Sequence, residues 1–133
     1  MDPVFITTEP VTSEDLLFEM GEHPCCGARI LFLGTVRKEN DGKRVDAIFY
    51  ECYGAMAKKE LDTIIQEAKK SWEVHEIGII HRVGKLSVGE ASLIVAIFSP
   101  HRKAAFLAVD YVIDQLKKRA PIFKKEIYEG LFR

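Results

Sequence analysis

Residues 76–121, EIGIIHRVGKLSVGEASLIVAIFSPHRKAAFLAVDYVIDQLKKRAP, decide the fold of this chain. Two apolar runs rich in β-branched residues, Glu76–Val83 and Ala91–Phe98, flank a glycine-punctuated turn and predict two strands. A helix is then expected to start at Ser99-Pro100, because serine is a good N-cap and proline suits the first helical position. Its apolar residues recur at three- and four-residue steps until Pro121 ends it. The stretch therefore predicts a hairpin followed by an amphipathic helix.

The remaining segments continue this alternation of strands and helices. Strands are predicted at Val4–Thr8, Gly27–Val36, Val45–Tyr53 and Ile122–Tyr128, and helices from Thr12 to about Gly21 and over Ala55–Trp72. The resulting order is β-α-β-β-α-β-β-α-β. We expect one α+β domain over residues 1–133, with a mixed or antiparallel sheet and helices on one face.

The bulk composition excludes several classes of protein. The chain has 133 residues, a formal net charge of -1 and 47% apolar residues. It lacks the overall basic balance of a nucleic-acid binder. It also lacks both an apolar run of about 18 residues that could span a bilayer and a basic, apolar leader at its start. We therefore expect a cytoplasmic protein without a nucleic-acid or membrane partner.

The spacing of cysteines and histidines predicts neither a metal nor a cofactor. Cys25, Cys26 and Cys52 are odd in number, and the adjacent pair lacks the spacer that zinc sites use. The four histidines, at 23, 75, 81 and 101, are scattered along the chain. No phosphate-binding or dinucleotide-binding glycine motif is present. Ordinary reduced thiols are the simplest interpretation, and a redox or sulfur-handling role is the alternative.

Positive charge is concentrated between Ser99 and Lys125. This segment holds seven Lys/Arg against two acids, whereas the rest of the chain holds twelve against eighteen. His101 and Arg102 fall in the opening turn of the predicted helix, where each positive charge costs about 0.3–1 kcal/mol. A bound anion would remove that conflict, and an arginine fork suits phosphate. The alternative is that these side chains turn away into solvent.

The basic residues farther along are less distinctive. Lys117 and its two basic neighbours lie in the last helical turn, where the dipole favours them, so simple helix capping explains them. Lys124 and Lys125 follow in an extended segment and point to opposite faces, so only one of them enters a given pocket. Arg37 closes a predicted strand, and alone it is an ordinary surface arginine. The residues thus indicate a basic pocket, which either only binds an anion or also catalyses a reaction on it.

Five motifs carry a resemblance to a known family. They are GTVR at 34–37, YECYGAMA at 50–57, HRVG at 81–84, SPHR at 99–102 and DQLKKRAPIFKKE at 114–126. In this order and spacing they resemble the catalytic (large) subunit family of molybdopterin synthase, over about residues 27–130. Phe123 stands where that family often has tryptophan. The resemblance implies an α/β hammerhead-like fold with an additional antiparallel β subdomain.

The same resemblance implies a sulfurtransferase of molybdenum cofactor biosynthesis. Such enzymes convert cyclic pyranopterin monophosphate into molybdopterin by building its dithiolene. The sulfur comes from a small ubiquitin-like subunit with a C-terminal Gly-Gly thiocarboxylate. One small subunit binds at each far end of a homodimer of the large subunit, which makes a heterotetramer. No cofactor or metal is implied, because the sulfur arrives already activated.

Matching residue by residue places the family's site on five positions. The catalytic lysines fall on Lys117 and Lys124. The substrate phosphate is expected on His101 and Arg102, with Arg37 supplied by the neighbouring protomer. Lys117 is expected to meet the thiocarboxylate tail, and to be acylated if sulfur transfer is covalent. Lys124 is expected to position substrate or to move protons.

Two other functions fit the basic segment. A non-catalytic module that binds a phosphometabolite or an acidic tail would need Arg102 but not Lys117. In a structural dimer, the segment would be only an interface, and replacing Arg102 would change the oligomeric state.

Overall fold

The computed structural model describes residues 2–128 as a mixed α+β fold, which confirms the predicted class. Its strands are β1 (Val4–Thr7), β2 (Ala28–Thr35), β3 (Glu39–Asn40), β4 (Lys43–Cys52), β5 (Glu76–Arg82), β6 (Gly84–Ser87), β7 (Ala91–Ser99) and β8 (Ile122–Tyr128). Its helices are α1 (Ser13–Glu19), α2 (Gly54–Ser71) and α3 (Arg102–Arg119). Within residues 2–128, none of the helices has the length and apolarity needed to cross a membrane.

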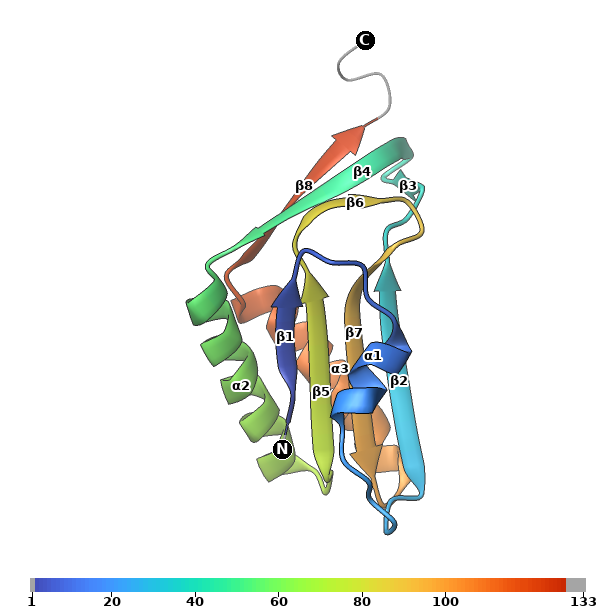
Figure 1. Cartoon of the computed structure of the whole chain (residues 1–133), viewed down its shortest axis with the longest axis vertical. Helices are drawn as coiled ribbons and strands as arrows, with labels where there is room; N and C mark the ends of the chain where they lie inside the picture. Colours follow the sequence, from blue (N-terminus) through green and yellow to red (C-terminus); the bar gives the residue numbers. More distant parts are fainter. Residues whose placement is uncertain (1, 129–133) are drawn as a thin grey trace.

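The main sheet has the strand order β1-β5-β7-β2. β1 and β5 run parallel, and the other neighbours are antiparallel (Figure 1). The central strand β5 is buried along its whole length and β7 along nearly all of it. Because both faces of these strands are apolar, both must be covered.

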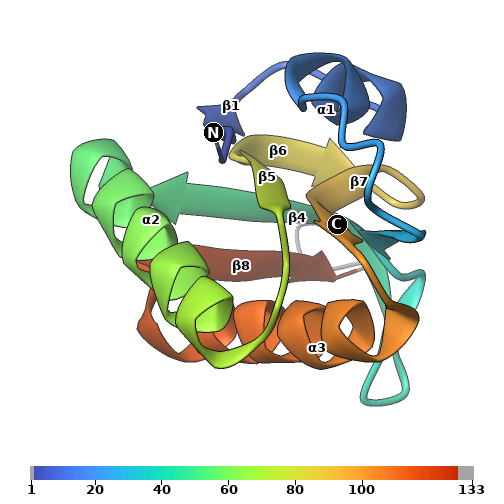
Figure 2. The ribbon, with the colours of Figure 1, turned by 90° about the horizontal axis from the view of Figure 1, so that it is seen from below.

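Helices cover both faces of this sheet, so the expectation of helices on one face is wrong for α1. Figure 2 shows α2 and α3 on one side of the sheet and α1 on the other. Leu16 of α1 and Met20, its C-cap residue, pack against Ile80, Ile94 and Phe98 of the sheet. The predicted start of α1 is confirmed, because its N-cap forms a reciprocal capping box three residues apart.

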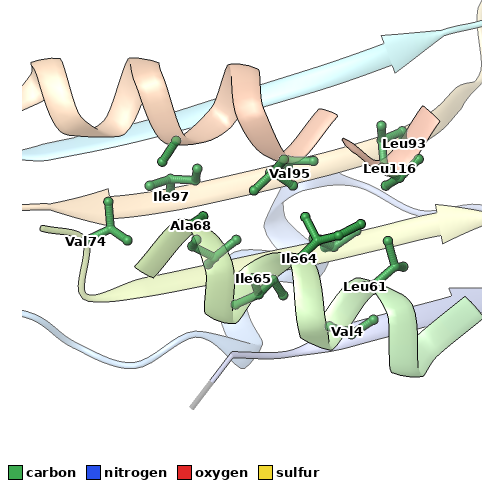
Figure 3. Packing of buried hydrophobic residues seen from close by; sticks show 14 of the residues in the cluster. Val4, Leu61, Ile64, Ile65, Ala68, Val74, Leu93, Val95, Ile97 and Leu116 are labelled. Carbon is green, nitrogen blue, oxygen red and sulfur yellow. The ribbon is translucent and has the colours of Figure 1, made fainter. Parts of the chain in front are cut away.

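The main core lies between the sheet and the pair α2–α3 (Figure 3). Leu61, Ile64 and Ile65 present the apolar stripe of α2, and all three are fully buried. Leu116 of α3 packs into the same cluster beside Leu93 of β7. Each buried aliphatic side chain of this size contributes about 1.5–3 kcal/mol. This packing sets the position of the last turn of α3, and therefore the position of Lys117, which follows Leu116.

Ion pairs clamp α2 to the same turn of α3. Arg119 lies 2.7 Å from a carboxylate oxygen of Glu60 and 2.6 Å from one of Glu67. Tyr111 also donates a hydrogen bond to Glu67, at 2.6 Å. The hydrogen bonds from Arg119 and Tyr111 hold the pKa of Glu67 at about 2. The clamp fixes the C-terminal end of α3 against α2.

A second, antiparallel sheet packs across one end of the main sheet (Figure 1). β4 is its central strand, with β6 on one side and β8 on the other. Gly84–Ser87 was expected only as part of a turn, but it pairs with Ala47–Tyr50 and buries Leu86 completely. This pairing is a long-range contact that the short segment does not reveal by itself. The sheet corresponds to the expected β subdomain.

Helix α3 starts later than predicted. Ser99 belongs to β7, where it pairs with Ala28, so it is not available as an N-cap. His101 takes the N-cap position without a side-chain capping hydrogen bond, and Arg102 is the first helical residue. The strand ladder thus outweighs the local capping preference. The basic residues still lie in the opening turn.

Candidate active site

A cavity of about 540 Å³ opens where the two sheets meet the C-terminal end of α3. It collects three of the predicted site residues in one chain: Arg37, which follows β2, Lys117 from the last turn of α3, and Lys124 of β8. Apolar and hydroxyl-bearing side chains from β2, β4, β7 and α3 form much of the remaining wall, and β5 contributes His81. Segments that are 80 residues or more apart in sequence therefore share one basic cavity.

A fixed carboxylate organises one side of this cavity. Asn40 donates to both oxygens of Glu126, at 2.8 and 3.0 Å, and Lys124 lies 3.3 Å from the same group. Arg37 donates to the Asn40 side-chain oxygen at 3.3 Å. Burial raises the pKa of Glu126, but the hydrogen bonds from Asn40, Lys124 and Tyr128 outweigh it and leave that pKa lowered. The cavity lining thus holds three cations against one carboxylate, and it favours an anion.

Three consecutive basic residues of α3 have different surroundings. Lys118 pairs with Asp114 at 3.0 Å on the exposed side of the helix, and Arg119 binds the two glutamates of α2. Lys117 lines the cavity and makes no ion pair or hydrogen bond with another residue in the range 2–128. The helix dipole favours all three residues alike, so what distinguishes Lys117 is its place in the cavity. Its ammonium is free to meet a ligand.

His81 is a cavity residue that the site prediction missed. It is 4% exposed, and its Nδ1 lies 2.8 Å from the Arg82 carbonyl oxygen. Because a carbonyl only accepts, Nδ1 carries the proton and Nε2 is left as an acceptor. Burial lowers the pKa of His81, so the imidazole is neutral. The only signal in the sequence was a histidine at the end of an apolar strand.

His101 and Arg102 lie in a different hollow, at the start of α3. With Lys103 and Phe106 they line it beside Gly27. The Gly27 amide donates to the Pro100 carbonyl at 3.1 Å, and a Cβ at position 27 would come 2.8 Å from that oxygen. Glycine is therefore required for the close approach that supports this turn. Two of the three predicted phosphate residues, His101 and Arg102, are thus together but apart from the lysines, whereas Arg37 lies with the lysines.

The length of α3 separates these two groups. Arg102 and Lys117 are 15 residues apart on one helix, which is about 22 Å at 1.5 Å per residue. A small phosphate cannot touch both within one chain. Arg37, which follows β2, lies with the lysines of its own chain and away from His101 and Arg102, so the prediction that Arg37 joins His101 and Arg102 from a neighbouring protomer stays a prediction. His101 and Arg102 are instead the residues that stand apart.

The histidines are not all scattered, which corrects a second expectation. His23 and His75 lie close to Cys26 at the other end of the main sheet. The sequence separation of about 50 residues hides this contact.

Residues 6–119 match the model of the MoaE protein family. The molybdopterin synthase catalytic subunit of Bos taurus is 44% identical over 128 residues, covering 96% of this chain and 67% of the bovine protein. The chain spans only 35% and 30% of the length of two Drosophila relatives. The crystal structure of molybdopterin synthase from Staphylococcus aureus superposes with a TM-score of 0.86 at 35% identity, covering 95% of this chain and 91% of that one. A chain from the Helicobacter pylori complex of subunits 1 and 2 of molybdopterin-converting factor shares the fold, with a TM-score of 0.72 at 24% identity over 98% and 91%.

Proposed function

The chain belongs to the MoaE protein family, and from that premise we propose that it is the catalytic subunit of a molybdopterin synthase. It acts as a sulfurtransferase in molybdenum cofactor biosynthesis. It converts cyclic pyranopterin monophosphate into molybdopterin with sulfur from the thiocarboxylate of a small ubiquitin-like subunit. The observation that carries the proposal is the cavity in which Arg37, Lys117 and Lys124 converge.

The three cations take different roles in this proposal. Lys117, which has no partner among residues 2–128, binds the incoming thiocarboxylate tail. Lys124 is held by Glu126 at 3.3 Å and positions the substrate. Arg37, restrained by Asn40, contributes a fork for the substrate's phosphate. The neutral imidazole of His81 offers a hydrogen-bond acceptor to the pterin.

A second copy of the chain would complete the site with His101 and Arg102. β2 is an edge strand of the main sheet. It exposes Leu31 (39%) and Leu33 (47%) on the face that carries α1, because α1 packs mainly on β5 and β7. An exposed apolar edge strand is a surface that a partner covers. We propose that it is the homodimer interface.

A two-fold axis at the middle of β2 would bring His101 and Arg102 of one copy close to the cavity of Lys117 in the other. Two-fold contacts put the start of one strand beside the end of the other. The start of β2 borders the hollow of Arg102, and its end borders the cavity of Lys117. The eight residues of β2 extend about 24 Å, which is close to the spacing between the two groups along α3. The dimer would therefore carry two composite sites, each served by one small subunit.

We also propose a cytoplasmic location. Cys25, Cys26 and Cys52 are free thiols, as is usual for proteins of a reducing compartment. The whole of residues 1–133 is proposed to form a single domain.

The decisive experiment compares Lys117→Ala with Lys118→Ala. The purified chain is mixed with thiocarboxylated small subunit and cyclic pyranopterin monophosphate, and the dithiolene product is measured. Loss of a charge that stabilises the reacting group lowers the rate by about 100-fold or more, so Lys117→Ala should be nearly inactive. Lys118→Ala removes only an exposed pair with Asp114, and it should stay within about twofold of the wild type.

The outcome separates the enzyme from the alternatives. A fully active Lys117→Ala protein would refute the role in sulfur transfer that is proposed for Lys117. A wild-type chain that binds the pterin without forming product would instead be a binding module. Circular dichroism and binding of the small subunit control for folding in both variants.

A further inference from the structure

A second group of reactive side chains lies at the end of the main sheet away from β4 and β8 (Figure 1). His23 and Cys26 come from the segment between α1 and β2, and His75 immediately precedes β5. One donor atom from each of the three lies within 4.8 Å of the others. Cys26 Sγ is 3.2 Å from His75 Nδ1. Two imidazoles and a thiol therefore converge on one point.

A buried carboxylate stands directly behind this group. Glu76 is 2% exposed, and its Oε1 lies 2.7 Å from His23 Nε2. The Gly21 amide donates to the same oxygen at 2.8 Å, which holds the carboxylate in place. Histidines that bind metals usually give their second ring nitrogen to such a carboxylate, which orients the ring. Glu76 has the position of that partner.

We propose that His23, Cys26 and His75 bind one zinc ion per chain, with Glu76 as the carboxylate partner of His23. Zinc–sulfur and zinc–nitrogen bonds of about 2.3 and 2.0–2.1 Å put tetrahedral donors roughly 3.3–3.6 Å apart. The Cys26–His75 pair, at 3.2 Å, is close to that separation. The widest pair needs to close by about 1 Å. A water molecule or an external ligand takes the fourth position.

The donor set selects the kind of metal. Two imidazoles and a thiol suit Zn²⁺, whereas Mg²⁺ and Ca²⁺ prefer oxygen ligands. The Cys26–His75 contact alone would also suit a nucleophilic thiol. That chemistry does not need a second imidazole or a buried carboxylate at the same point, and both are present here. The thiol proton leaves to solvent when the metal binds.

The position of the site indicates a structural role. Gly27 directly follows Cys26, and its amide bonds the Pro100 carbonyl just before the basic turn of α3. A metal held by His23, Cys26 and His75 would cross-link the α1–β2 segment to the start of β5. It would thereby restrain the backbone beside His101 and Arg102. It takes no part in the sulfur chemistry itself.

The test is a metal titration of the full chain without a histidine tag. One equivalent of Co²⁺ should produce thiolate-to-cobalt absorption with the visible bands of a tetrahedral ion, and Zn²⁺ should displace it. Cys25→Ser is the matched control, because Cys25 is adjacent to Cys26 but outside the cluster, and this variant should titrate like the wild type. Cys26→Ser should lose the charge-transfer band. Glu76→Gln should weaken Zn²⁺ binding by about 10-fold or more.

Three results would overturn the proposal. The first is a wild-type chain that shows no thiolate-to-cobalt band, a result that does not depend on any variant folding. The second is an unchanged band in Cys26→Ser. The third is an equal loss in Cys25→Ser, which would indicate non-specific thiol binding. None of these outcomes bears on dithiolene formation, so the proposed function would stand or fall separately.

Discussion

Heterodimers that carry one defect in each copy test whether the active site is shared between protomers. One copy carries Arg102→Ala and the other carries Lys117→Ala. Because α3 separates these residues by about 22 Å within one copy, each composite site of the proposed homodimer would take its arginine from one copy and its lysine from the other. Each homodimer has two defective sites. The heterodimer has one intact site and one site with both defects, so it should recover about half of the wild-type activity.

The assay needs pure heterodimers. The two variants are co-expressed with different affinity tags and purified on both in sequence. Dithiolene product is then measured per chain, with the thiocarboxylated small subunit in excess. The parental homodimers set the baseline, expected at about 1% of wild type or less.

A second heterodimer provides the matched control. Lys117 and Lys124 line the cavity of the same chain. A Lys117→Ala copy paired with a Lys124→Ala copy leaves one defect in every site, so its activity should stay near the baseline. A heterodimer of Arg102→Ala and Lys117→Ala that is no more active than its parents would refute the shared site. It would leave the role of Lys117 untouched.

Two further predictions concern stability. The pKa of Glu67 is about 2 when folded, against 4.5 for the free group, so its stabilisation is complete above about pH 4.5 and is lost as the pH falls towards 2. Thermal unfolding should therefore show a lower melting temperature for Glu67→Gln than for wild type at pH 7. The difference in melting temperature should shrink as the pH falls from about 4.5 towards 2, and a difference that does not depend on pH would contradict this. Gly27→Ala should lower the free energy of unfolding in urea by about 1–3 kcal/mol, because its Cβ would come 2.8 Å from the Pro100 carbonyl oxygen. Gly54→Ala, with open space around it, is the control, and equal stability of the two variants would show that the close approach is unimportant.

The helices and long strands were predictable because their signals are local. The periodicity of α2 and the capping box at Thr12 follow from neighbouring residues, and both appear in the structure. The apolar runs of β5 and β7 likewise form the centre of the main sheet. These features need no knowledge of distant contacts. The family motifs could also be recognised from their order along the chain.

Other features of the fold depended on which segments meet. β6 has only four residues, and it becomes a strand because β4 offers it a partner. Ser99 is a good N-cap by propensity, but the ladder with β2 keeps it in β7. α1 lies on the opposite face from α2 and α3 because both faces of the central strands are apolar. In each case, a tertiary contact outweighed or supplemented the local preference.

The functional groups show the same division. Lys117, Lys118 and Arg119 are adjacent and equally favoured by the helix dipole, yet their 100° rotations around the helix direct them to the cavity, to solvent and to α2. His23, Cys26 and His75 come together only because the α1–β2 segment folds back to the start of β5. Sequence patterns report what a residue's neighbours favour. Distances between side chains that are far apart in the chain are set by packing, so the structure alone decided which of these basic residues lines the cavity and which histidines meet.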